Sequence, residues 1–101
     1  MIFALIVPGP IEDVEQVRVL EWHGEVGQHF EADELIVELE THKALVEVRA
    51  EQPGYLRVIV SPEGDWKAIG QPLALLSDTP DEPLPDSPDG ASQLPVTFEV
   101  L

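Results

Sequence analysis

Residues 35–48 read LIVELETHKALVEV, in which two short runs of alternating apolar and polar residues, 35–39 and 45–48, flank the five residues ETHKA. A period of two is typical of a strand with one buried face. The five residues between the runs are too few for anything but a tight turn, so the segment predicts a β-hairpin. Its turn places Lys43, one of only two lysines in the chain, at the hairpin tip among carboxylates. This position indicates a lysine that another protein can reach.

The composition limits the classes of protein to which the chain can belong. It has 101 residues and no cysteine, so we expect one domain with a thin, regular core, no disulfide and no thiolate site. The chain contains no run of about 18 apolar residues, so no membrane span is predicted. The apolar residues 1–7 lack a basic flank and are interpreted as a strand rather than a signal peptide, so the expected location is the cytoplasm.

Acidic residues dominate the charge. There are 20 of them against 5 basic residues, a formal net charge of −15. This charge repels nucleic acid and anionic lipid and favours partners with basic docking surfaces. Solubility alone would account for it equally well.

Short apolar runs separated by glycine and proline turns continue through the chain. No window has a convincing helical period, so we expect an all-β fold with no helix longer than two turns. The predicted strands are residues 2–7, 16–22, 34–40, 44–49, 55–60 and 73–76.

The two halves of the chain repeat one pattern of strand, glycine turn and strand. Residues 17–39 are echoed by residues 56–76, with Gly27 and Gly64 at matching places. The repeat predicts a flattened barrel or sandwich of two roughly four-stranded sheets related by a pseudo-two-fold axis. One end would carry Lys43 and the other end both termini. The predicted core residues are Leu20, Leu35, Val37, Leu39, Val46, Val48, Leu56, Val58, Leu73 and Leu75.

The composition changes after the last predicted strand. We therefore divide the chain into a domain at 1–79, a proline- and acid-rich flexible linker at 80–93 and a strand-like segment at 94–101. The last segment could pair with a sheet edge of this chain or of a partner. Because a long charged linker makes docking on the same chain entropically costly, mobility of this segment is the favoured expectation.

Several features around Lys43 point to a known family. Residues 38–44 read ELETHKA, Gly27 lies 16 positions before the lysine, Gly54 lies 11 positions after it, and residues 70–75 read GQPLAL. In this arrangement the chain resembles lipoyl domains, the swinging-arm carriers of 2-oxo acid dehydrogenase complexes. The resemblance covers nearly all of residues 2–78.

The resemblance implies a lipoyl-like barrel-sandwich hybrid with lipoic acid in amide linkage on Lys43. It implies that Glu40, Thr41, His42 and Ala44 form the hairpin that a lipoate ligase or lipoyl transferase recognises. The domain would shuttle acyl or aminomethyl groups between dehydrogenase, acyltransferase and dihydrolipoyl dehydrogenase components. It would be a carrier rather than an enzyme, and a monomer in isolation.

Two residues depart from the family pattern. His42 stands where the family commonly has aspartate, which bears on recognition by the ligase. Asp33 stands where the family usually has glycine, although aspartate tolerates a left-handed backbone better than most residues. Neither departure removes the acceptor amine.

Three other interpretations of Lys43 stay open. It could be an ordinary solvated turn lysine, or the domain could be an unmodified interaction module. Biotinyl carriers share the fold and hairpin, but their lysine usually lies between two methionines, and the only methionine here is Met1. Lipoate is therefore preferred over biotin.

No other set of residues predicts a catalytic or metal site. His23, His29 and His42 lack metal-ligand spacing. A thin-cored domain without a cleft offers no environment that shifts carboxyl pKa values. Trp22 is expected to pack at the sandwich end, and Trp66, in a polar loop, to be partly exposed and available to a partner.

Overall fold

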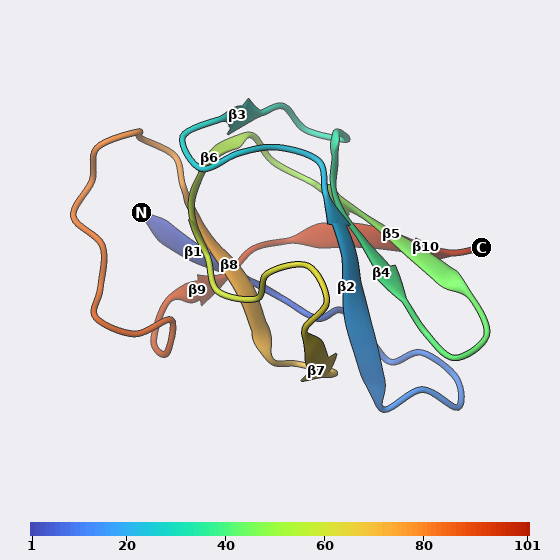
Figure 1. The fold of residues 1–101 in the computed structure, drawn as a ribbon. Coiled ribbons are helices and arrows are strands. Elements are labelled where there is room, and N and C mark those ends of the chain that lie inside the picture. The colour runs from blue at the N-terminus through green and yellow to red at the C-terminus, as the bar shows by residue number, and fades with distance from the viewer.

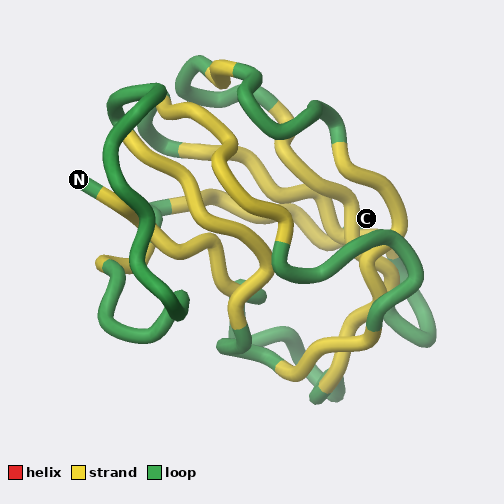
Figure 2. Tube along the Cα trace, turned by 60° about the vertical axis from the view of Figure 1, so that its left-hand side comes forward, coloured by secondary structure: helices red, strands yellow, loops and turns green.

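The structure is a computed structural model that describes residues 1–101. It contains ten strands and no helix, and so none that could span a bilayer. The strands form two five-stranded sheets, in the orders β3-β6-β8-β1-β9 and β10-β5-β4-β2-β7, which Figures 1 and 2 show as two facing layers. Their bounds are β1 (Ile2–Ile6), β2 (Gln16–Trp22), β3 (His29–Phe30), β4 (Leu35–Glu40), β5 (Leu45–Ala50), β6 (Gly54–Ile59), β7 (Trp66–Ala68), β8 (Pro72–Ser77), β9 (Ser92–Gln93) and β10 (Val96–Val100).

The predicted pseudo-two-fold arrangement is confirmed by the topology. Exchanging β1 with β5, β2 with β6, β3 with β7 and β4 with β8 converts the order β3-β6-β8-β1 into β7-β2-β4-β5, which is the order in the other sheet. Six of these eight strands match predicted ranges, and the two short strands β3 and β7 were not predicted. The fifth strand of each sheet, β9 or β10, comes from the C-terminal residues and lies beside β1 or β5, which are equivalent positions.

The apolar core lies between the sheets and draws on both. Most of the predicted core residues are buried, namely Val37, Leu39, Val46, Val48, Leu56, Leu73 and Leu75. Leu20, Leu35 and Val58 are only partly buried, and the prediction was wrong for them. In β2 the inward residues are Val17 and Val19, so Leu20 takes the opposite face. Irregular registers at Leu35/Val37 and Leu56/Val58 interrupt the simple alternation on which the other two predictions rested.

The turn before β4 has the conformation that the family's glycine would supply. Asp33 has a φ of 71°, and Glu34 N–H donates to the Glu31 carbonyl at 3.2 Å. Asp33 therefore occupies the third place of a tight turn, where a positive φ favours glycine or asparagine. Its N–H donates to the Ala50 carbonyl at 2.7 Å, which ties the turn to β5.

The C-terminal segment pairs with an edge of this chain's own sheet, which is one of the two alternatives that the sequence left open. All of β10 is antiparallel to β5, from Val96 opposite Ala50 to Val100 opposite Val46. Leu94 is 1% exposed within the core, and its N–H donates to the Ala4 carbonyl at 2.8 Å. The apolar side chains before and along β10 thus provide the burial that offsets the cost of ordering the segment.

The two termini lie at opposite ends of the molecule (Figure 1). The Met1 amine contacts Asp78 Oδ1 at 2.7 Å, at the end away from Lys43. The other terminus returns to the lysine end, because Leu101 N–H donates to the Leu45 carbonyl at 2.8 Å. The prediction that both termini lie away from the lysine is therefore correct only for Met1.

Candidate functional site

The predicted hairpin is present, with β4 and β5 paired up to Glu40 opposite Leu45. Thr41 closes the turn. Its N–H donates to the Ala44 carbonyl at 2.8 Å. Its Oγ1, in a residue only 6% exposed, accepts from the N–H groups of Lys43 at 3.1 Å and Ala44 at 2.9 Å. The buried hydroxyl therefore takes up the turn's inward-facing donors and fixes its backbone.

Lys43 projects from this turn into solvent. Its side chain is 47% exposed, and its Nζ lies 3.7 Å from Oδ2 of Asp13, which is 77% exposed. Asp13 belongs to the loop between β1 and β2, so that loop lies beside the hairpin tip (Figure 1). An ion pair this exposed is worth at most about 1 kcal/mol, so it does not hold the amine away from a reacting partner.

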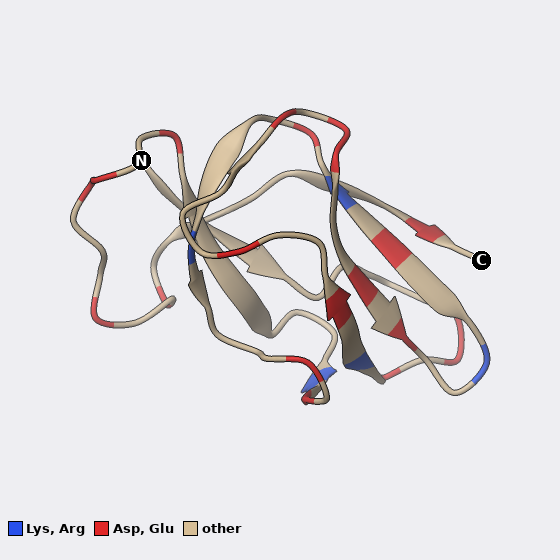
Figure 3. Cartoon of the chain, turned by 45° about the horizontal axis from the view of Figure 1, so that its top comes forward, with Lys and Arg blue, Asp and Glu red and all other residues tan.

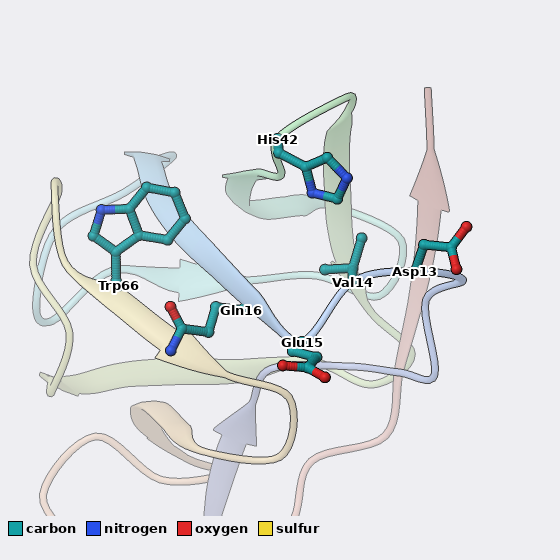
Figure 4. Close-up of a pocket in the computed structure, with 6 residues that line it drawn as sticks. All are labelled: Asp13, Val14, Glu15, Gln16, His42 and Trp66. Atoms are coloured by element: carbon teal, nitrogen blue, oxygen red, sulfur yellow. The ribbon is translucent and has the colours of Figure 1, made fainter.

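The other predicted hairpin residues have different surroundings. Glu40 accepts from Arg18 Nη1 at 3.5 Å across the sheet. His42 is exposed and lines a pocket of about 680 Å³ with residues of the β1–β2 loop, β2 and β7 (Figure 4). Ala44 is partly buried and adds no bulk at the turn. The structure thus places Glu40 at the end of β4 and the other three residues in the turn after it. The sequence gave no signal that Asp13 and Trp66 would be neighbours of this turn.

Four glutamates form a row across the outer face of the sheet that carries the hairpin. Glu21 lies opposite Glu38, Glu38 opposite Glu47, and Glu47 opposite Glu99. Figure 3 shows acidic bands side by side on neighbouring strands of this sheet, with a basic band beyond them at a hairpin tip. Like charges directly opposite each other destabilise a sheet. The glutamate row therefore lowers the stability of this sheet and makes its outer face strongly negative.

His23 lies nearer to carboxylates than its place in the sequence indicated. Its Nε2 is 2.5 Å from Glu38 Oε1, and the ligating atoms of Glu21, His23 and Glu38 lie within 4.8 Å of one another. A hydrogen bond between His23 Nε2 and Glu38 Oε1 accounts for this proximity, and we assign no metal to the group. Trp22 packs against the core and donates from Nε1 to the Ser61 carbonyl at 2.9 Å.

Comparison with known proteins identifies the family. The family model described as "Biotin-requiring enzyme", which covers biotin and lipoyl attachment, matches residues 4–76. The chain belongs to the biotin/lipoyl attachment family. Its relatives share the hairpin-bearing part of the fold and extend well beyond it.

Curated relatives of this attachment domain are components of large complexes. One is the dihydrolipoyllysine-residue succinyltransferase component of the 2-oxoglutarate dehydrogenase complex of Staphylococcus saprophyticus, 38% identical over 72 residues, which are 71% of this chain and 17% of the relative. The same component of Haemophilus influenzae is 36% identical over 77 residues, 76% of this chain and 19% of the relative. The mitochondrial pyruvate dehydrogenase complex protein X component of Saccharomyces cerevisiae is 31% identical over 77 residues, 75% of this chain and 19% of the relative. The chain thus spans less than a fifth of each.

The attachment domain has the features that a covalently carried group requires. Members of the family carry lipoate or biotin in covalent linkage. Lys43 supplies an exposed amine on a turn whose backbone hydrogen bonds are internal. Neither neighbour of this lysine is a methionine. The residues therefore fit a group attached through an amide at Nζ.

Proposed function

We propose that this attachment domain is a lipoyl carrier whose lipoyl group is attached to Lys43 Nζ. The observation that carries the proposal is the exposed amine of Lys43 on a turn locked by Thr41. Such a turn presents the amine in one backbone geometry while the side chain stays free to move. The group supplies redox and acyl-transfer chemistry when bound, and the protein supplies placement and recognition.

The choice of lipoate over biotin rests on two features. Several curated relatives are named for a dihydrolipoyllysine residue. The residues beside Lys43 are His42 and Ala44 rather than methionines. A ligase for lipoate would then read Glu40, Thr41, His42 and Ala44 together with the amine.

The partners that we propose follow from the relatives. Dehydrogenase, acyltransferase and dihydrolipoyl dehydrogenase components of a 2-oxo acid dehydrogenase complex would meet the arm in turn, and the domain itself would catalyse no step. Its acidic sheet face, which includes Glu38 and Glu47, supports partners that dock through basic surfaces.

Intact mass spectrometry tests the proposal. The protein, expressed with lipoate and a lipoate ligase, is expected to gain the mass of one lipoyl group. Lys43→Ala should abolish the gain, and Lys67→Ala, which removes the only other lysine, should preserve it. A gain with biotin and a biotin ligase alone would instead make the domain a biotinyl carrier. No gain with several ligases of either kind would leave the unmodified interaction module as the function.

A further inference from the structure

The pocket beside the hairpin is built from parts of the chain that are far apart in sequence. Its lining residues are Asp13, Val14, Glu15, Gln16, His42 and Trp66, and its volume is about 680 Å³. In Figure 4 the β1–β2 loop and the start of β2 form its base, with the His42 turn above it and Trp66 at one side. A space of this size takes a small organic group.

The attachment lysine lies at the edge of this pocket. Asp13, one of the lining residues, has its Oδ2 3.7 Å from Lys43 Nζ, and His42 next to Lys43 is another. Amide formation at Nζ would remove the positive charge and with it the attraction to Asp13. A group attached there would therefore begin at the mouth of the pocket, on a side chain that no longer forms the ion pair with Asp13.

Trp66 provides an apolar contact surface in the pocket. It is 56% exposed, whereas Trp22 is packed and hydrogen-bonded to Ser61. Trp66 lies opposite Arg18 in the sheet, and Arg18 lies opposite Glu40. The Trp66 indole therefore belongs to the row of residues across the strands that ends at Glu40, next to the hairpin turn. Val14, 8% exposed, adds an apolar patch on the base. Covering an exposed indole with an apolar group is favourable.

We propose that this pocket holds the distal dithiolane end of the lipoyl group on Lys43 while no partner is engaged, with Trp66 as its main contact. The inference rests on the proposed function. The methylene chain and ring are apolar and suit Val14 and the indole, and sulfur atoms contact aromatic rings favourably. Sulfur–aromatic contacts favour the held position by roughly two- to tenfold, so the arm remains available to partners.

Fluorescence of the two tryptophans tests the inference, because a disulfide in contact with an indole quenches its emission. In Trp22→Phe, where Trp66 is the only tryptophan, lipoylation should lower the emission to roughly half or less, given a two- to tenfold preference for the pocket. In Trp66→Phe, where only Trp22 remains, the emission should be unchanged. Reducing the dithiolane with a phosphine should restore the Trp66 emission.

A second measurement needs no tryptophan variant. In the ¹⁵N-labelled wild-type protein, lipoylation should shift the indole Nε1–H resonance of Trp66 and leave that of Trp22 in place. This keeps the inference testable even if Trp22→Phe does not fold.

The state of the lysine is established separately, so failure of the proposed function and failure of this inference are distinguishable. Intact mass and peptide mapping confirm the lipoyl group on Lys43. If no ligase attaches it, an activated ester of lipoic acid on Lys67→Arg protein acylates Lys43 and the Met1 amine, and peptide mapping distinguishes the two adducts. A biotin ester on the same variant is the control, because it provides a tether without a disulfide.

Unchanged Trp66 emission and resonance in protein shown by mass to carry the lipoyl group would overturn the inference. A Trp66 response that arises only when a partner enzyme is added would also overturn it, and would make the pocket a docking surface for that enzyme.

Discussion

The side-chain oxygen of Thr41 lies 3.1 Å from the backbone nitrogen of Lys43 and accepts its hydrogen. The same oxygen accepts from Ala44 N–H at 2.9 Å. One buried hydroxyl therefore fixes the backbone geometry at which Lys43 leaves the sheet.

Thr41→Ala is expected to destabilise the domain by about 1–2 kcal/mol, because it leaves two backbone donors of the turn without their partner. Denaturant unfolding measures the change, and lipoylation by a ligase should slow in parallel. Thr41→Ser keeps the hydroxyl and is the matched control. If Ala and Ser variants unfold alike, the hydroxyl does not hold the turn.

His42→Asp is expected to speed lipoylation, because it restores the acidic residue that the family commonly has beside the lysine. Initial rates of lipoate transfer by one ligase measure the effect. His42→Asn is the control, since it matches aspartate in size without its charge. Equal rates for all three proteins would show that the ligase does not read this position.

Leu94→Ala is expected to cost about 2–5 kcal/mol, the range for a leucine removed from a packed core. Leu94 lies outside the family match at residues 4–76 but is 1% exposed. The control is Leu84→Ala, because Leu84 is 38% exposed in the preceding loop and should cost less than about 0.5 kcal/mol. Similar melting temperatures for the two variants would mean that β10 is not docked in solution.

Glu99→Lys is expected to stabilise the domain by about 0.2–1 kcal/mol, because Glu99 lies opposite Glu47 in the glutamate row. The gain should shrink as salt is added, since the charges lie on an outer face. Glu12→Lys makes the same change in net charge at an exposed loop position away from the row. If Glu12→Lys stabilises the domain as much as Glu99→Lys does, the effect comes from net charge rather than from the glutamate row.

Asp33→Ala is expected to cost about 1 kcal/mol, and Asp33→Gly to be neutral or stabilising by up to about 1 kcal/mol. The positive φ of 71° at Asp33 suits glycine and disfavours alanine. Thermal unfolding of the three proteins gives the order. A higher melting temperature for the alanine variant than for the wild type would contradict it.

The hairpin, the paired halves and the exposed lysine at the turn could all be predicted from the sequence, because each depends on local physics. Alternation at a period of two specifies a strand with one buried face. A four-residue turn follows from the distance along the chain between the two runs, and the Thr41 hydroxyl acts within three residues of itself. The repeat of Gly27 at Gly64 is likewise visible without coordinates.

Tertiary structure decided what lies beside that hairpin. The pocket joins His42 and Trp66 only because β2 pairs with both β4 and β7. The glutamate row depends on the register of four strands, and a shift of one residue would break it. The docking of β10 depends on an open β5 edge and on space for Leu94 in the core. Contacts between residues distant in the chain form only when the free energy gained by burial exceeds the entropic cost of closing the loop between them. That balance depends on the packing of the whole domain and cannot be judged from a local segment.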